Sequence, residues 1–412
     1  MTIQINSKLP LRGRAAVVLL LALAALSLPL FSQTAPATDV AHGTPHDAQT
    51  DQAFDYFFNM EHDRAVQEFE RILDRHPNDP FAVNHLLAAV LMHDLYDTGG
   101  MNTGDYTNDS FIGHSPRPTD PKIKERIKQL AARAQSLEEQ RLKANPKDVD
   151  ALYCRGVTRA QFAVYTGLIE RAWFSALRNA VGARHDHEKV LELDPDYLDA
   201  KMVVGTHNYV VGNLPWTYRT AATLAGLSGS KEKGLTYLRE VARSDGENSV
   251  DAKVLISLFL RREHKYDEAL GYMRDLSTRY PHNHLFATEV ANLLRASGHL
   301  DESEAMYRKV WQTGQEGKYD RLHYEMAAWG LGDLLRSKKD YAAAAAAYDL
   351  VNQAPNPDPD ILQKANLAAG EMYDLLQKRD LAMKSYETVL AGNANTGPAD
   401  QARRYIREAY RE

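Results

Sequence analysis

The sequence contains one cysteine, Cys154. An intrachain disulfide needs two thiols, so no disulfide framework holds this chain together. Thiolate pairs for zinc are excluded too. His282 and His284 are close enough in sequence to converge in a loop, but no further Cys or His lies near them to complete a site. We therefore expect no metal, and we expect Cys154 to be a small core residue of a helix.

Patterns typical of a β-sheet or of catalysis are also missing. No segment alternates β-branched residues over the length of a strand, so we expect almost no sheet. The phosphate-binding pattern G-x-x-x-x-G-K-[ST] has no match, and no convincing G-x-G-x-x-G follows a strand. The nucleophile elbow G-x-S-x-G does not occur. The carboxylates are scattered along predicted outer helix faces. These absences predict a protein that is not an enzyme and uses no cofactor.

Positive charge is not in excess, and three basic side chains lie within the first fourteen residues. An apolar run over residues 15–28 follows them, and small residues stand at 35–37. This order predicts a secretory signal peptide over residues 1–37, with an uncleaved membrane anchor as the alternative. Cleavage would remove three positive and no negative side chains and take the formal net charge from −6 to −9. Such a charge disfavours nucleic acid as a partner. We expect an exported protein, periplasmic or associated with the cell envelope.

The sequence does contain a repeat. Four landmarks recur after 34 residues: Tyr266, Ala269, Met273 and Leu276 are followed by Leu300, Ser303, Tyr307 and Val310. A period of this length predicts helix-turn-helix units. Because one helix pair cannot bury its apolar face alone, the units must stack into a solenoid.

The segments Lys265–Pro281 and Gly298–Val310 resemble the tetratricopeptide repeat family. Its pattern has a small residue in the first helix, Ala at the start of the second, an aromatic four residues later and Pro at the closing turn. Altered copies of the pattern are marked by Ala65, Phe69, Ile72 and Pro77, by Gly332, Ala344, Tyr348 and Val351, and by Gly370, Ala382, Tyr386 and Val389. Gly156 and Pro195 mark a further repeat that is too long, because Pro146 to Pro195 is 49 residues, 15 more than one period. The resemblance covers most of residues 45–395 and implies peptide or protein binding without catalysis. The segment from Gly205 to Leu235 also resembles, loosely, eukaryotic tetratricopeptide proteins of the mitochondrial outer membrane.

We therefore predict an all-α, right-handed superhelical solenoid of about seven to eight helix-turn-helix pairs, irregular in its first half. A flexible lead-in over 38–50 precedes irregular repeats over 51–246, which carry insertions at 97–118 and 212–229. Regular repeats follow over 247–395, and a capping helix closes the chain over 396–412. Three helix starts are predicted by an aspartate followed by proline, at Asp79, Asp120 and Asp358.

In the tetratricopeptide family the inner groove is lined by fixed positions of each first helix. The resemblance places there Arg261, Arg262, Asn292, Arg295, Trp329, Asp333 and Arg336. Guanidinium groups bind carboxylates with two parallel hydrogen bonds. The groove is therefore predicted to bind a protein or peptide that is acidic or offers its C-terminal carboxylate. The alternative is that these arginines pair with neighbouring Asp and Glu or cap helix ends.

A second set of side chains forms either core or an apolar patch for a partner. Its members are Tyr153, Met202, His207, Tyr209 and Trp216. The predicted function is a non-catalytic interaction scaffold in the bacterial envelope. Two alternatives stay open: a structural homo-oligomer that pairs through this aromatic surface, and an enzyme with its site near the 97–118 loop and His207.

Overall fold

The computed structural model describes residues 48–101, 118–216, 219–220, 223, 227–319 and 323–412. Within these ranges the chain is helical and has no β-strand, which confirms the all-α prediction. The predicted signal peptide and most of the 97–118 insertion lie outside the described residues. The chain divides into two compact units. Unit 1 comprises Met1–Phe57 and His62–Arg262, and unit 2 comprises Phe58–Glu61 and Glu263–Glu412.

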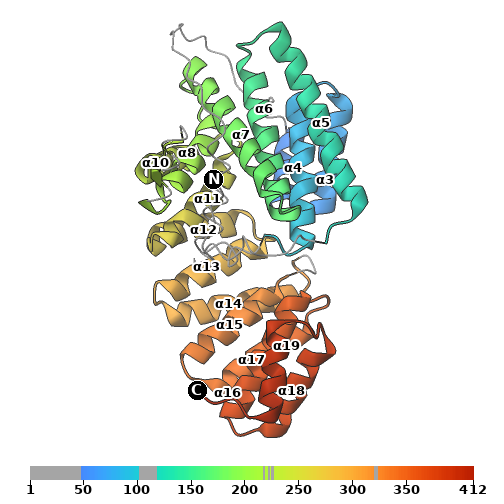
Figure 1. Ribbon diagram of the computed structural model, residues 1–412, viewed down its shortest axis with the longest axis vertical. Helices are drawn as coiled ribbons and strands as arrows, with labels where there is room; N and C mark the ends of the chain where they lie inside the picture. The colour runs from blue at the N-terminus through green and yellow to red at the C-terminus, as the bar shows by residue number, and fades with distance from the viewer. Residues whose placement is uncertain (1–47, 102–117, 217–218, 221–222, 224–226, 320–322) are drawn as a thin grey trace, which may run out of the picture. The chain divides into compact units, whose positions relative to one another are not determined.

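Unit 1 is built from helices of unequal length. They are α2 (Ala48–Phe58, whose last residue belongs to unit 2), α3 (His62–Arg75), α4 (Pro80–Asp97), α5 (Pro121–Ala144), α6 (Val149–Val164), α7 (Trp173–Leu193), α8 (Ala200–Gly212), α10 (Lys231–Arg243) and α11 (Ser249–Arg262). Helices adjacent in sequence pack together, most extensively α6 on α7 and α8 on α10 (Figure 1). A π-helical turn, Tyr165–Ile169, extends α6. Helices α5 and α7, with 24 and 21 residues, are far longer than those of a regular repeat.

Unit 2 is more regular. Its helices are α12 (Tyr266–Arg279), α13 (His284–Ala296), α14 (Leu300–Gln315), α15 (Glu325–Ser337), α16 (Tyr341–Leu350), α17 (Pro359–Leu375), α18 (Arg379–Ala391) and α19 (Gly397–Arg407). The landmarks Tyr266 and Leu300 are the first residues of α12 and α14, as the 34-residue period predicts. The closing helix is shorter than expected, because it ends at Arg407 and leaves an extended segment behind it.

The three predicted helix starts are confirmed. Each aspartate accepts a hydrogen bond from a backbone N–H of the first turn: Asp79 from Phe81 at 3.0 Å, Asp120 from Lys122 at 2.8 Å and Asp358 from Ile361 at 3.0 Å. Proline follows each aspartate and removes a donor that would otherwise stay unpaired. Side-chain caps of this kind stabilise a helix by about 1 kcal/mol.

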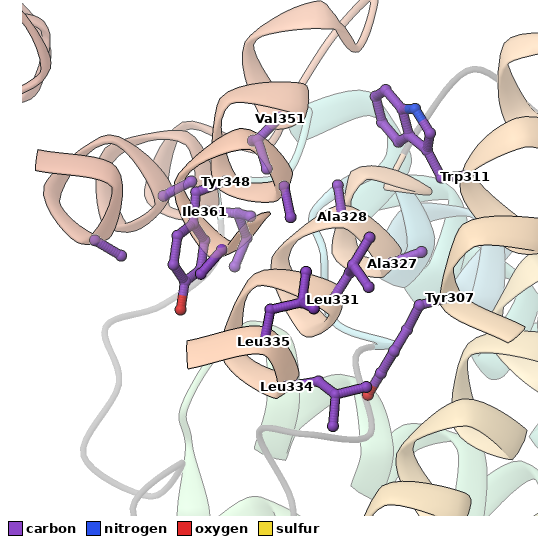
Figure 2. Packing of buried hydrophobic residues seen from close by; sticks show 14 of the residues in the cluster. Tyr307, Trp311, Ala327, Ala328, Leu331, Leu334, Leu335, Tyr348, Val351 and Ile361 are labelled. Atoms are coloured by element: carbon purple, nitrogen blue, oxygen red, sulfur yellow. The ribbon is translucent and has the colours of Figure 1, made fainter. Parts of the chain in front are cut away.

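The core of unit 2 depends on small residues that lie under aromatic rings. A Cβ atom on Gly332 would lie 2.4 Å from the ring of Tyr348, and one on Gly370 would lie 2.4 Å from the ring of Tyr386. Figure 2 shows Tyr348 and Tyr307 among the aliphatic side chains of this core. The rings of Tyr307 and Tyr348 are fully buried. The small-plus-aromatic pattern read from the sequence therefore describes a real contact between the two helices of a pair.

Candidate partner-binding face of unit 2

Helices α13, α15 and α17 are the first helices of three successive pairs in unit 2. α13 contacts α15 and α15 contacts α17, in addition to the contacts that each makes with its second helix (Figure 1). In stacked helix pairs, the concave binding surface follows from the small rotation between repeats. We call α13, α15 and α17 the inner row.

Each helix of the inner row carries two polar residues spaced three apart. They are Asn292 and Arg295 on α13, Asp333 and Arg336 on α15, and Glu371 and Asp374 on α17. Residues at this spacing share one helix face. We call these six residues the polar ladder. The sequence analysis did not single out Glu371 and Asp374, although the repeated spacing of polar pairs on otherwise apolar helices was a signal that could have found them.

The arginines of the polar ladder pair with acids on the next helix of the row. Arg295 Nη1 lies 3.8 Å from Asp333 Oδ2, and Arg336 Nη1 donates to Glu371 Oε2 at 2.7 Å. The side chains of Arg295, Asp333 and Arg336 remain 33, 35 and 32% exposed, while that of Glu371 is 9% exposed. This arrangement is the pairing that the sequence left open as the alternative. Binding of a partner by these arginines stays a prediction.

Tyrosines from the second helices hold the ladder from beneath. Tyr348 donates its hydroxyl to Asp333 Oδ1 at 2.8 Å, and Tyr386 donates to Asp374 Oδ2 at 2.8 Å. In the first pair, the hydroxyl of Tyr307 contacts Asn292 Oδ1 at 2.5 Å. Because each ring is fixed in the core, each hydroxyl fixes the rotamer of one ladder residue.

Burial shifts the pKa values of the ladder. It raises the pKa of the Asp333 carboxyl, against the opposing hydrogen bond from Tyr348, and it raises the pKa of Glu371, against the opposing charge of Arg336. Burial also disfavours the charge of Arg336, but the adjacent Glu371 outweighs that effect, so the pKa of the guanidinium is raised. The ladder thus places charges of opposite sign next to one another in a partly dry setting, where hydrogen bonds to a ligand gain strength.

The remaining residues predicted for the groove are placed differently. Trp329 lies on α15, half-buried, with its ring 5.3 Å from that of Tyr348, so it is partly core. Arg261 and Arg262 are the last two residues of α11 in unit 1, and both are half-buried. The structure brings Asn292, Arg295, Trp329 and Arg336 together on the inner row of unit 2.

The five residues of the second predicted surface do not form one exposed patch. Tyr153 and Tyr209 are core residues: Tyr153 stacks on Tyr197 at 4.7 Å and Tyr209 on Phe259 at 3.9 Å. Periodic aromatic spacing identifies a helix face but not whether that face is covered. Met202 and His207 are half-buried, and burial lowers the pKa of His207 to about 4. Trp216, at 73% exposure, is the open member of the set.

Unit 1 gathers a polar cluster where the segment before α11 meets α4 and α6. His85 Nε2 lies 2.8 Å from Glu247 Oε1, and Asn248 Nδ2 donates to the hydroxyl of Tyr153 at 2.8 Å. The backbone N–H of Asn248 donates to Asp199 Oδ1 at 3.2 Å. These bonds hold the segment in place, which is a structural role. In the part of the chain that is described, no group of three or more His, Cys, Asp or Glu could hold a metal ion.

The chain has a tetratricopeptide-like repeat fold. A family model described as regulator of microtubule dynamics protein 1-3 matches residues 118–297, a range that includes the segment from Gly205 to Leu235. No curated protein matches the chain. None of the described helices is long and apolar enough to cross a membrane.

Several solved structures match the chain at low identity and with low TM-scores. The APC/C hetero-tetramer Cut9-Hcn1 is 13% identical, with a TM-score of 0.48 over 88% of this chain, and this chain spans 56% of that one. Yeast Tom70 is 14% identical, with a TM-score of 0.40 over 87% of both chains. PilF of Pseudomonas aeruginosa is 16% identical, with a TM-score of 0.37 over 61% of this chain and 97% of that one.

Proposed function

We propose that the chain is a non-catalytic interaction scaffold whose polar ladder holds an extended segment of a protein partner. The observation that carries the proposal is the state of Arg295, Asp333 and Arg336. Each keeps about a third of its side-chain surface open, and hydrogen bonds hold Asp333 and Arg336 in place. Groups that are already ordered lose little entropy when a ligand binds, so their hydrogen bonds contribute more to affinity.

Within the ladder, Arg295 is the anchor for a partner's carboxylate. Its distance of 3.8 Å from Asp333 is longer than a hydrogen bond, whereas Arg336 makes a 2.7 Å bond to Glu371. The guanidinium of Arg295 therefore keeps donors for a new acceptor, and a guanidinium can bind a carboxylate through two parallel bonds. An acidic side chain or a terminal carboxylate of the partner fits this position.

The compartment is part of the proposal. The leader pattern of residues 1–37 supports a scaffold in the bacterial envelope. The match of residues 118–297 to regulators of microtubule dynamics supports a second candidate, a role at microtubules. Co-sedimentation of the purified chain, from residue 38 onward, with polymerised tubulin separates the two, because an envelope scaffold has no reason to pellet with the polymer.

The scaffold is tested with a displayed library of random linear peptides panned against the purified chain. Enriched peptides are then measured by fluorescence polarisation against the wild type and Arg295→Ala. We expect acidic peptides to be enriched and Arg295→Ala to weaken their binding about tenfold, the effect of losing one charge-assisted hydrogen bond.

Arg308→Ala is the matched control, because Arg308 lies on the second helix α14 and pairs there with Glu304. Its affinity for the same peptides should stay within about twofold of the wild type, since the surface pair that it breaks has no place in the ladder. An absence of enriched peptides, or equal losses in both variants, would overturn the proposal.

A further inference from the structure

The last five residues of the chain, Glu408–Glu412, lie against the inner row. α19 ends at Arg407, and Glu408 is extended, with φ −139° and ψ 120°. The backbone N–H of Tyr410 then donates to Asp374 Oδ2 at 2.8 Å, and its hydroxyl accepts from Arg336 Nη2 at 3.0 Å. Glu412 Oε2 accepts from the hydroxyl of Tyr341 at 2.8 Å. The segment therefore runs from α19 past α17 to α15 and the start of α16.

We propose that Glu408–Glu412 is a displaceable internal occupant of the polar ladder, and that a partner segment carrying a tyrosine and, two residues later, a carboxylate takes its place. This inference rests on the proposed function, because it concerns the same surface. It adds the chemistry of the ligand and a competitor supplied by the chain itself.

Departure of the segment leaves no ladder charge unpaired. Arg336 keeps its 2.7 Å bond to Glu371. Asp374 keeps the guanidinium of Arg379 at 2.8 Å and the hydroxyl of Tyr386 at 2.8 Å. Stranding a buried charge is what makes the loss of an ion pair costly, and that cost does not arise here. In addition, Arg411 and Glu412 are exposed and Tyr410 is only half-buried, so little apolar area returns to water.

The helix before the segment is anchored independently. Arg379 Nη2 donates to the carbonyl oxygens of Tyr405 and Ile406 at 2.6 and 2.8 Å. These two carbonyls belong to the last turn of α19, which would otherwise leave them without partners. The anchor lies before Arg407, so α19 keeps its cap when residues 408–412 leave.

The contacts of the segment define what a competitor must offer. It needs a backbone N–H for Asp374, a phenol for Arg336 and a carboxylate for the hydroxyl of Tyr341. The ring of Tyr410 also lies 5.8 Å from the Arg336 guanidinium and packs edge-on to Tyr405 at 5.2 Å. A tethered occupant competes at an effective concentration in the millimolar range. A longer partner gains an advantage if it also reaches the neighbouring Arg295–Asp333 pair.

The test uses a fluorescent synthetic peptide with the sequence of residues 408–412. Its binding is compared between the full chain and a chain that stops at Arg407. We expect binding to the shortened chain to be at least about tenfold tighter, because its ladder has no tethered competitor. In the shortened chain, Arg336→Ala should lose most of this binding, whereas Arg308→Ala should not. A peptide with phenylalanine in place of the tyrosine should bind more weakly.

A full-length Tyr410→Ala variant decides the matter if the shortened chain fails to fold, since it weakens the occupant and leaves α19 whole. It should bind the peptide more tightly than the wild type does. Equal binding by the wild type, the shortened chain and Tyr410→Ala would overturn the inference. If the tail peptide binds the shortened chain and no library peptide does, the proposed function fails while the internal occupant stands.

Discussion

In both units an aromatic ring packs against a glycine of the neighbouring helix, but the residue type that supplies the ring differs. In unit 2 the ring is a tyrosine, as in the pairs Gly332–Tyr348 and Gly370–Tyr386. In unit 1 a Cβ atom on Gly156 would lie 2.3 Å from the ring of His187. The geometry of the contact is therefore shared, but the ring that fills it is not.

The two kinds of ring respond differently to acid. The tyrosines of unit 2 donate their hydroxyls to the ladder, and burial raises the pKa of Tyr348 further from neutrality. His187 bonds its Nδ1 to the carbonyl oxygen of Ala183 at 2.8 Å, and burial lowers its pKa to about 4. Burial also lowers the pKa of His62 to about 3. Unit 1 thus contains buried imidazoles whose protonation opposes folding.

The largest loss of stability is expected where the backbones of two helices, α8 and α10, are in contact. A Cβ atom on Gly234 of α10 would lie 2.5 Å from the backbone nitrogen of Tyr209 and 2.7 Å from the carbonyl oxygen of Gly205 on α8. Neither atom can move without shifting a helix. We expect Gly234→Ala to lower the free energy of unfolding by about 3 kcal/mol, which the urea midpoint measures.

Gly271→Ala on α12 of unit 2 is the matched control. Apart from the neighbouring residues and the backbone of the helix itself, no atom lies within 4 Å of the position that its Cβ would take. The same change should therefore raise stability by about 0.5–1 kcal/mol, because alanine is the better helix former. A neutral Gly234→Ala would mean that α8 and α10 do not pack as closely as the structure shows.

Local signals in the sequence predicted the elements well. The starts at Asp79, Asp120 and Asp358 depend on a side chain and the turn that follows it, and all three are confirmed. The period of unit 2 also located the first residues of α12 and α14. These features need no information from distant parts of the chain.

Contacts between residues far apart in the sequence were harder to predict from the sequence. The polar ladder needs the rotation of each helix and the spacing between pairs, and the pairing of Arg336 with Glu371 cannot be read from either residue alone. Likewise, the sequence pattern named no ring partner for Gly156, and the long α7 of unit 1 supplies His187. Irregular helix lengths break the register on which a sequence pattern depends.

The second largest change in stability is expected from the protonation of His187 at acidic pH. Its folded pKa of about 4 lies below the unfolded value of 6.5, so the unfolded chain takes up the proton first as the pH falls. His187 therefore contributes stability above pH 6.5 that is lost as the pH falls toward 4. Between pH 7 and 5 the loss should be about 2 kcal/mol. His187→Gln removes this pH-dependent contribution. In urea unfolding experiments, the difference in free energy of unfolding between the wild type and the variant should therefore narrow as the pH falls.

His185→Gln makes the same chemical change two residues away, at an exposed position of α7. Because that ring is in contact with water in both states, the control should follow the wild type at each pH. Parallel curves for wild type and His187→Gln would show that the imidazole under Gly156 is not kept neutral by the fold.

The smallest expected change in stability comes from His85 in the same unit, and its dependence on pH is opposite to that of His187. Burial disfavours its charge, but Glu247 outweighs burial, with a smaller contribution from Asp79, and the pKa of His85 is raised. A raised histidine pKa contributes stability below 6.5 that is lost as the pH rises through the folded value.

Glu247→Gln should therefore lower the free energy of unfolding by about 1–2 kcal/mol at pH 5.5, where the charged hydrogen bond to His85 is formed, and by less at pH 8. Urea midpoints at the two pH values measure the difference. His187→Gln and Glu247→Gln then form a pair within one unit: acid narrows the first variant's deficit and widens the second's. A deficit of Glu247→Gln that grows with pH would mean that His85 is neutral in the fold.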